Sequence, residues 1–439
     1  MQRRKFLALL SASVASTSLV ACAGTNSTDP NAKKSGGSGE EVKDLKWWSN
    51  HPGTSKDVEK ELIKRYNEEN PDIKIELIDA GQSYAEVGQK FNAALSGSDL
   101  PDIVVVADVT WYNFAINGQL ANVDELAEEA GVDLSTYVKP LYEDYAYDGG
   151  HFALPFARST PLFYYNKEAW KKAGLEDRGP ESWEEMDEWA KKLEKANGKM
   201  KPFGWADAAN YLSWYFQGAN WAQGGQFSDE WDIKCTDEKT IKAVEWLKKT
   251  TDKKDGYAYM SNNIEMDFAS GLCAATTLST GSLAGVMEEA DFEVGTAFLP
   301  NPTGEGACPT GGAGLGIPAG IPRERQIEAL KFIDFITNTK NTGYWSQNVG
   351  YMPVRTDAPK DPDQKKFMEE NPNFATAIEQ LPDTRPQDYV RIFLPNGDKE
   401  IGGALETIIT NGADVKKTMD DLQKKLQSVY DNQVKPIIG

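Results

Sequence analysis

The chain has 439 residues, with 47 Lys or Arg against 67 Asp or Glu, which gives a formal net charge of −20. Such an acidic chain repels nucleic acids and anionic lipid headgroups, so we expect no DNA or RNA partner. The length exceeds what one hydrophobic core usually serves, which predicts two domains. The sequence holds two histidines, His51 and His151, and no CxxC or HExxH spacing, so we expect neither a metal site nor a cofactor.

The first 21 residues have the features of an export signal. A charged start, Arg3 to Lys5, precedes a small apolar segment that is too short to span a membrane permanently. This segment ends in Leu-Val-Ala-Cys, which resembles a bacterial lipobox, so we expect Cys22 to be lipidated and to become the mature N-terminus. The paired arginines also resemble a twin-arginine signal, with Gln2 in place of the usual Ser or Thr, so the general and the twin-arginine export routes both stay open.

Residues 22–42 are poor in apolar side chains and rich in Gly, Ser and Asn, which predicts a flexible tether. A lipid followed by a tether and a folded part predicts a protein outside the cytoplasm, anchored to the bacterial cell membrane by the lipid on Cys22. This location permits a disulfide. Three further cysteines are present, Cys235, Cys273 and Cys308, and the sequence leaves their pairing open.

Strands and helices alternate over the first part of the folded chain. The patterns predict a strand at 45–48, a helix that Ser55 caps, a strand at 73–77, a helix at 84–96 and a strand at 103–107. The last strand is an unbroken apolar run, which is typical of a parallel strand covered on both faces. This alternation predicts an α/β fold with a doubly wound sheet.

Two polar side chains follow the predicted strands at their carboxyl ends, where ligands bind in open α/β sheets. Asp108 directly follows the strand at 103–107, and Tyr84 follows the strand at 73–77. Both are therefore candidate ligand-binding residues. Asp108 is also well placed to cap the helix that begins near Thr110, and Tyr84 to be a half-buried surface aromatic.

The sequence from Ala153 to Trp170 combines a polar bend with apolar segments on both sides. Residues 158–161 contain two small hydroxyl side chains and a proline, and the aromatic run at 162–165 predicts a buried strand, followed by a helix from near Asn166. A stiff polar crossing between two ordered segments suits a ligand-holding hydroxyl such as Ser159. An ordinary loop-to-strand junction is the alternative.

Three later segments carry further candidates. Residues 205–221 are unusually aromatic and include Tyr211. We expect most of these rings to lie in the core. The others are expected to stack on sugar rings or to enclose a cationic head group. A strand at 273–278 leads into the hydroxyl-rich turn 279–283 and then a helix, which predicts free N–H donors for an anion, or simple helix capping. Glycines in 311–314 let the backbone approach a ligand closely.

Several stretches resemble one family over essentially the whole chain after the signal. They are LPFARSTPLFYYNKEAWKKAGL, GLCAATTLSTGSLAG, ALKFIDFI and YWSQNVGYMPV. The resemblance is to the extracellular solute-binding proteins of ABC importers, in the sugar-binding class, and within that class to the glycerol-3-phosphate-binding branch. It implies no enzymatic activity, and delivery of a small-molecule ligand to the transmembrane permease subunits of an ABC importer.

The same resemblance implies a two-lobed periplasmic-binding-protein fold with a hinge and an interlobe ligand cleft that closes on its ligand. The chain is expected to cross between the lobes more than once. Lobe 1 is then formed by residues 43–157 plus 309–355, and lobe 2 by residues 158–308 plus 356–439.

The resemblance also implies which residues bind the ligand. The residues matching the phosphate contacts are Ser159, Thr280, Ser282, Gly312, Tyr351 and Arg391, and those matching the glycerol contacts are Tyr84 and Asp108. Asp108 stands where that branch has a longer glutamate. Tyr211 and Ala208 fall near its flanking tryptophan pair, which is not preserved. Because this departure leaves room beside the glycerol, the expected ligand is glycerol 3-phosphate or a larger glycerophosphodiester.

Two other functions stay open from the sequence. The same fold and transport role suit a neutral sugar or oligosaccharide, with Asp108 bonding hydroxyls and tryptophans stacking on rings; this ligand has no need of Arg391. A more remote alternative is an extracellular glycoside hydrolase, since acidic residues are plentiful enough to form a catalytic pair. The sequence specifies neither the permease partner nor the degree of cleft closure.

Overall fold

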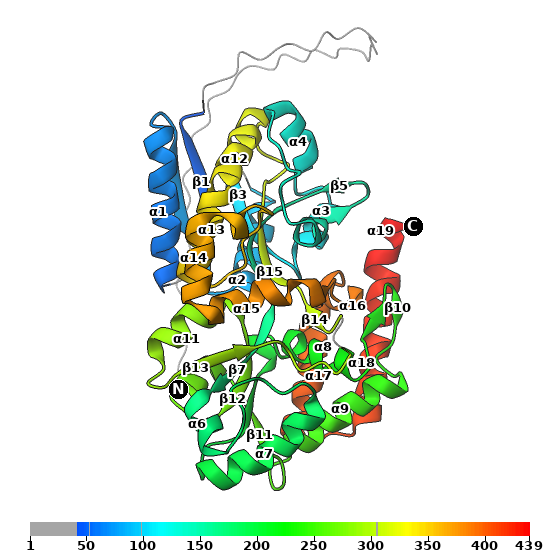
Figure 1. The fold of residues 1–439 in the computed structure, drawn as a ribbon. Helices are drawn as coiled ribbons and strands as arrows, with labels where there is room; N and C mark the ends of the chain where they lie inside the picture. Colours follow the sequence, from blue (N-terminus) through cyan, green and yellow to red (C-terminus); the bar gives the residue numbers. More distant parts are fainter. Residues whose placement is uncertain (1–41, 52, 98, 304–305) are drawn as a thin grey trace, which may run out of the picture. The chain divides into compact units, whose positions relative to one another are not determined.

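Two five-stranded sheets form the centre of the computed structural model, which describes residues 42–51, 53–97, 99–303 and 306–439 (Figure 1). The predicted signal segment, the lipidation at Cys22 and nearly all of the tether lie outside the described residues. Contacts group Glu41–Gly439 into one unit, so the lobe boundaries expected from the sequence stay a prediction.

The two sheets share one pattern of strand directions. In each, three neighbouring strands are parallel, the fourth is antiparallel to the third, and the fifth is antiparallel to the fourth. In order across the first sheet the strands are β2 (Lys74–Asp79), β1 (Asp44–Ser49), β3 (Ile103–Ala107), β15 (Gly311–Gly316) and β6 (Leu154–Ser159). Across the second sheet they are β11 (Ala258–Ser261), β8 (Phe203–Ala206), β12 (Ala275–Ser279), β7 (Pro161–Asn166) and β13 (Val294–Ala297). The predicted α/β class is confirmed, with an antiparallel strand added to each sheet.

The chain passes from the first sheet to the second through a single residue. β6 ends at Ser159 and β7 begins at Pro161, so only Thr160 separates the two strands. The carbonyl oxygen of Thr160 accepts the N–H of Thr280 at 3.0 Å, which ties the crossing to the end of β12. The predicted aromatic strand and the helix after it, α6 (Lys167–Lys172), are confirmed. The bend predicted at 158–161 is wrong in extent, because strand pairing continues through Ser159 and resumes at once.

Helices cover the first sheet and fix the segments that lead to its strand ends. They are α1 (Gly53–Glu69), α2 (Tyr84–Ala94), α3 (Trp111–Ile116), α4 (Val123–Ala130), α12 (Arg323–Ile336) and α13 (Thr339–Val349). α1 packs against α12 and α13, and α2 packs against β3 (Figure 1). Ser55 lies in the first turn of α1 and does not cap it, because the helix begins two residues earlier, at Gly53. Exact helix ends are poorly specified by a local pattern.

A second set of helices surrounds the other sheet. They are α7 (Trp183–Asn197), α8 (Leu212–Ala222), α9 (Glu238–Thr250), α10 (Ile264–Ala269), α11 (Leu283–Glu289), α16 (Tyr389–Ile392), α17 (Gly397–Asn411) and α18 (Val415–Val429). The aromatic segment forms α8, whose residues are all buried except Ala222. Ser182 caps α7, since its hydroxyl accepts the N–H of Glu185 at 3.1 Å.

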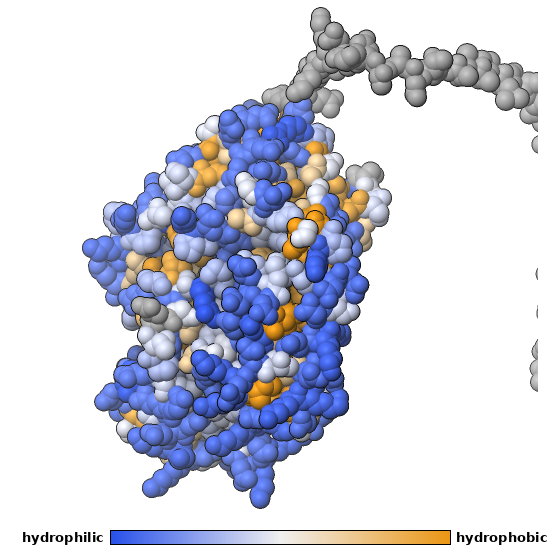
Figure 2. Space-filling model, turned by 90° about the vertical axis from the view of Figure 1, so that its right-hand side faces the viewer, coloured by the Kyte–Doolittle hydropathy of each residue, from blue (hydrophilic) through white to orange (hydrophobic). Residues whose placement is uncertain are grey.

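The surface of the described chain is mostly hydrophilic, and the face in Figure 2 carries only scattered apolar patches. No helix in the described ranges has the length and apolar character that a membrane crossing requires. Cys235, Cys273 and Cys308 are all buried and unpaired, so the disulfide that the sequence permitted does not form between them. Burial raises the pKa of each thiol, that of Cys273 to about 12, which keeps all three protonated.

Candidate ligand-binding site

A cavity of about 190 Å³ collects the predicted site residues from segments that are far apart in the sequence. Its lining residues are Tyr84, Asp108, Ser159, Tyr211, Trp214, Tyr215, Glu265, Ser279, Gly281, Ser282, Gly312, Tyr351 and Arg391. Every residue predicted to bind ligand is in this set except Thr280. The Thr280 side chain is fully buried and is not part of the lining, so its assignment as a ligand contact is not supported by its position.

Strand ends place several of these residues at the cavity. Ser159 ends β6, Ser279 ends β12, and Asp108 follows β3 directly. Asp108 does not cap the helix after it: its Oδ1 accepts the N–H of the adjacent Val109 at 2.9 Å, and its Oδ2 accepts from the Gln387 amide at 2.5 Å. Its carboxylate is therefore held at the cavity by a residue from a distant part of the chain.

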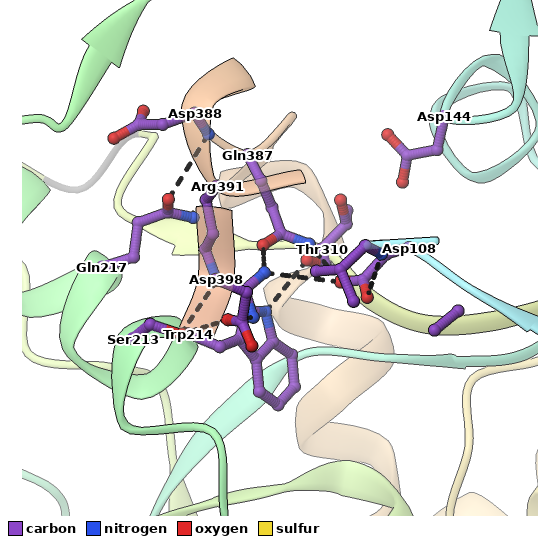
Figure 3. A network of polar contacts seen from close by, with 12 residues as sticks. Asp108, Asp144, Ser213, Trp214, Gln217, Thr310, Gln387, Asp388, Arg391 and Asp398 are labelled. Carbon is purple, nitrogen blue, oxygen red and sulfur yellow. Dashed lines mark hydrogen bonds and ion pairs between the residues drawn. The ribbon is translucent and has the colours of Figure 1, made fainter. Parts of the chain in front are cut away.

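Arg391, on α16, is the cationic residue of the lining and is 2 % exposed. Its Nη2 lies 2.7 Å from Asp398 Oδ1, and its Nη1 lies 3.6 Å from Asp108 Oδ2 (Figure 3). The guanidinium also donates to the Ser213 hydroxyl at 3.3 Å and to the Gln387 amide oxygen. Two carboxylates thus lie beside one buried positive charge, and the guanidinium also lines the cavity.

A second buried arginine stands behind the cavity and was not identified from the sequence. Arg158, in β6, donates to the Tyr145 hydroxyl at 3.0 Å and pairs with Asp144. Burial raises the pKa of Asp108, and the positive charges of Arg391 and Arg158 oppose that rise. Burial likewise raises the pKa of Asp144, against the opposing charge of Arg158. The two arginines therefore oppose the effect of burial on the pKa of these carboxyls.

The hydroxyl-rich turn between β12 and α11 lies at the cavity, but the backbone N–H groups of Thr280 and Gly281 already have partners. The N–H of Gly281 donates to the Ser279 hydroxyl at 3.1 Å, and the N–H of Thr280 donates to the Thr160 carbonyl. The Ser282 hydroxyl donates to Glu265, a lining residue that was not predicted. The expected free backbone N–H groups are therefore absent at residues 280 and 281, because a 3₁₀ turn and a strand crossing satisfy them.

Position 312 requires glycine because of its backbone conformation. Its φ of +95° lies in the region that favours glycine, and a Cβ there would stand 2.1 Å from the carbonyl oxygen of Ala157. Its own carbonyl accepts the N–H of Asp108 at 3.0 Å. The glycine therefore allows β15 to approach β6 closely and exposes backbone at the cavity wall.

Two tyrosines from separate segments meet at one wall of the cavity. The Tyr84 and Tyr351 hydroxyls lie 3.1 Å apart, and the Tyr84 hydroxyl lies 3.3 Å from His51 Nε2. Burial raises the pKa of both tyrosines, so both keep their protons. His51 was noted in the sequence only as one of two histidines, although its place two residues after β1 is the strand-end signal that identified Asp108.

Among the described residues, no group of three or more His, Cys, Asp or Glu side chains is arranged to hold a metal ion. The cavity instead offers one guanidinium, several hydroxyls, aromatic faces and two carboxylates. This set suits a small polar solute with an anionic group and hydroxyls.

Comparisons with known proteins agree with this arrangement. Residues 61–376 match the model of the family described as bacterial extracellular solute-binding protein. The sn-glycerol-3-phosphate-binding periplasmic protein UgpB of Escherichia coli K12 is 30% identical over 375 residues, covering 81% of this chain and 84% of that protein. The crystal structure of UgpB from Mycobacterium tuberculosis in complex with glycerophosphocholine is 48% identical, with a TM-score of 0.86, and covers 90% of this chain and all of that chain.

More distant structures share the fold alone. The GacH receptor of Streptomyces glaucescens, solved unliganded and with acarbose, is 20% identical, with a TM-score of 0.78, over 90% of this chain and all of that chain. The architecture of the chain is that of the two-lobed periplasmic binding proteins, with the cavity between two α/β parts. The protein belongs to the bacterial extracellular solute-binding protein family.

Proposed function

We propose that this protein captures glycerol 3-phosphate or a glycerophosphodiester outside the cytoplasm and delivers it to the permease of an ABC importer. The observation that carries the proposal is Arg391, a fully buried guanidinium that lines a small cavity rich in hydroxyls. A planar guanidinium matches two phosphate oxygens at once, and its hydrogen bonds to an anion are about twice as strong as neutral ones. The 30% and 48% identical relatives bind, by name, glycerol 3-phosphate and glycerophosphocholine.

The lining residues can be assigned to the phosphate and to the glycerol by their chemistry. Ser159, Ser282, Tyr351 and Arg391 offer donors for phosphate oxygens, and Gly312 leaves backbone accessible beside them. Asp108 and Tyr84 then remain for the glycerol hydroxyls, since a carboxylate accepts and a tyrosine hydroxyl both donates and accepts. The binding of phosphate at Arg391 requires the guanidinium to exchange part of its contact with Asp398 or Asp108 for the ligand.

The size of the cavity supports this ligand class over an oligosaccharide. About 190 Å³ is below the roughly 300–1,000 Å³ typical of sites for drug-sized ligands. A polyol phosphate of few heavy atoms suits such a space. Tyr211, which is 39% exposed at the lining, leaves the phosphate's substituent a way toward solvent, so a diester is accommodated as well.

Binding and delivery, without catalysis, form the proposed activity, and the lipid on Cys22 forms the proposed membrane attachment. The attachment is tested by mass spectrometry of the exported protein, in which a diacylglycerol on Cys22 supports it. An unmodified cysteine, or cleavage at another position, contradicts it.

The ligand is tested by calorimetric titration of the protein with glycerol 3-phosphate, glycerophosphocholine and a panel of neutral oligosaccharides. We expect binding of at least one phosphorylated ligand, and a loss of about 100-fold or more in Arg391→Ala, because charge-assisted hydrogen bonds are removed and Asp398 is left unpaired. Arg323→Ala is the matched control, since Arg323 pairs with Glu129 on the surface, away from the lining. Binding of neutral sugars only, or unchanged phosphate affinity in Arg391→Ala, contradicts the proposal.

A further inference from the structure

A buried carboxylate and a buried histidine lie directly behind the tyrosine wall of the cavity. Glu59, on α1, is 1% exposed, and His51, just after β1, is 6% exposed. His51 Nδ1 lies 3.0 Å from Glu59 Oε1, and the Ser49 hydroxyl donates to the same oxygen at 2.6 Å. Neither Glu59 nor His51 lines the cavity, so the proposed ligand contacts do not account for this pair.

The pair is connected to the cavity by an unbroken chain of hydrogen bonds. His51 Nε2 lies 3.3 Å from the Tyr84 hydroxyl, and that hydroxyl lies 3.1 Å from the Tyr351 hydroxyl. Both tyrosines line the cavity. Each hydroxyl has one hydrogen to donate, so the direction of donation at one end of this chain fixes the direction at the other.

The number of protons on the pair decides that direction. When Glu59 and the imidazole hold two protons in total, one lies between Nδ1 and Glu59 and the other is on Nε2. Nε2 then donates to the Tyr84 hydroxyl. One of the two tyrosine hydrogens bridges the two hydroxyls, and the other is left to donate into the cavity. With one proton, held between Nδ1 and Glu59, Nε2 must accept from Tyr84, and Tyr84 in turn accepts from Tyr351. The cavity then meets oxygen lone pairs, which repel an anion.

The two states differ in the net charge that they place in a buried site. The single-proton pair carries a net negative charge in a place where the remaining neighbours of the imidazole are aromatic. The rings of Phe156, Trp345, Tyr84 and Tyr351 lie with centroids 5.3–6.0 Å from that of His51. Glu59 is the charged side chain in hydrogen-bond contact with His51, Ser49 is a neutral donor, and the two tyrosines are the other titratable groups facing it. An uncompensated buried anion is costly, whereas the two-proton pair is neutral overall.

We propose that the Glu59–His51 pair is a positioning element that makes the hydrogen-bonded tyrosine pair, Tyr84 and Tyr351, donate one O–H toward an anionic ligand. The inference rests on the proposed phosphate-bearing ligand. Its consequence is a coupling between binding and protonation: the complex holds the Nε2 proton of His51 more tightly than the free protein does. Affinity therefore falls as rising pH removes that proton, and binding under those conditions takes up a proton.

The test uses glycerophosphocholine as the probe, because a phosphodiester and a quaternary ammonium keep their charges across the neutral range. Affinity is measured by calorimetry from about pH 6 to about pH 9, in pairs of buffers with different ionisation enthalpies, and nitrogen-15 NMR reports the His51 ring in parallel. We expect a loss of about tenfold or more on deprotonation of Nε2, with proton uptake on binding. An affinity that stays constant while Nε2 loses its proton overturns the inference, as does a complex in which Nε2 carries no proton.

The chain offers a matched control in its other histidine. His151 Nδ1 lies 2.9 Å from Asp124 Oδ2, outside the cavity lining. His151→Gln should keep the pH dependence and leaves a single histidine signal, which assigns His51. His51→Gln supplies an N–H that does not titrate and should make the affinity independent of pH; retained pH dependence in this variant contradicts the inference.

The two proposals fail in different ways. If the wild-type protein binds no phosphorylated ligand at any pH, the proposed function is wrong. If it binds with no linkage to His51, only the positioning role is wrong. The NMR measurement on the ligand-free protein gives the reference against which the Nε2 proton of the complex is compared.

Discussion

The two walls of the cavity are built by different means. The wall around β3, β15 and α2 holds its groups by backbone geometry and a neutral hydrogen-bonded chain: Gly312 is locked at a φ that favours glycine, and Tyr84 is tied to His51. The wall around β12 and α16 holds its donors by opposite charges. There Arg391 is paired with Asp398, and the Ser282 hydroxyl is bonded to Glu265.

The difference shows how one cavity can be both ready for a ligand and stable without it. Groups fixed by the backbone keep their positions whether or not a ligand is bound. Donors paired with carboxylates have their charge compensated while the cavity is empty, and a phosphate then competes with those carboxylates. A residue fixed by its backbone, such as Gly312, should therefore respond to substitution through the stability of the fold, and a donor paired with a carboxylate, such as Arg391, through affinity.

The largest effect is expected from Gly312→Ala. A Cβ at φ +95° and 2.1 Å from a backbone oxygen should lower the free energy of unfolding by about 4 kcal/mol, from strain and overpacking together. Urea denaturation followed by tryptophan fluorescence measures this change. Gly403→Ala, in α17 with open space around it, is the control and should be neutral or slightly stabilising. Equal stabilities for the two variants would contradict the role of Gly312.

The next effect concerns the segment that carries Arg391. Asp388, just before α16, accepts from Trp221 Nε1 at 3.1 Å and from the N–H of Phe227 at 2.6 Å, and burial raises its pKa to about 6. The folded state therefore binds more protons than the unfolded state between about pH 4 and about pH 6, so this carboxyl's contribution to stability falls as pH rises through that window. The fall amounts to about 3 kcal/mol, from a shift of about two units.

Asp388→Asn should remove this pH dependence, although the amide also loses one acceptor and lowers stability at all pH values. The measurement is the difference in unfolding free energy between wild type and variant at about pH 4 and at about pH 7. Exposed Asp291→Asn is the control and should show a smaller change with pH. A difference that does not vary with pH would mean that Asp388 titrates alike in both states.

A smaller effect is expected from Tyr351→Phe. The substitution removes one hydroxyl from the cavity wall and leaves the ring, which is stacked on Trp345, in place. Affinity for a phosphorylated ligand should fall about tenfold, the value of one hydrogen bond to a charged group, while the unfolding midpoint changes little. Tyr344→Phe on α13 is the control, because Tyr344 lies under the Arg65 guanidinium and not in the lining. A similar loss in both variants would locate the effect outside the cavity.

The smallest effect is expected from Glu265→Gln, and it is a gain. The substitution removes a negative charge beside the Ser282 hydroxyl, so the affinity for glycerol 3-phosphate should rise about two- to fivefold at low salt. The gain is small because Glu265 is exposed, and it should shrink as salt is added. Glu289→Gln on α11 is the exposed control. A loss of affinity would mean that Glu265 contacts the ligand itself.

Local pattern was enough to predict two of the strands that end at the cavity, β3 and β12, whereas a polar bend was predicted where β6 ends. The strand at 103–107 agrees with β3 at both ends, because an unbroken β-branched run has few other solutions. Asp108 followed from a strand end, Ser159 from a polar bend between two apolar segments, and Ser282 from a hydroxyl-rich turn after a strand. These are signals carried within about ten residues of sequence.

The partners of those residues could not be predicted, because they come from far along the chain. Asp108 and Gln387 are 279 positions apart, and Ser282 meets Glu265 only through the packing of α10 against α11. Thr280 was assigned through the resemblance, in which it matches a hydroxyl of the same turn as Ser282. Thr280 is fully buried and absent from the lining, and a sequence pattern does not specify which hydroxyl of such a turn lines the cavity.

The three buried thiols have a practical consequence for the folded part of the chain. Because Cys235, Cys273 and Cys308 are unpaired and protonated, no covalent crosslink between them contributes to the fold, and stability should be the same in oxidising and reducing surroundings. Because these three thiols are buried and protonated, they should not react with thiol-directed reagents in the folded protein. A cysteine introduced on each side of the cavity would take up fluorescent labels selectively, and the distance between the labels would then report opening and closing in real time.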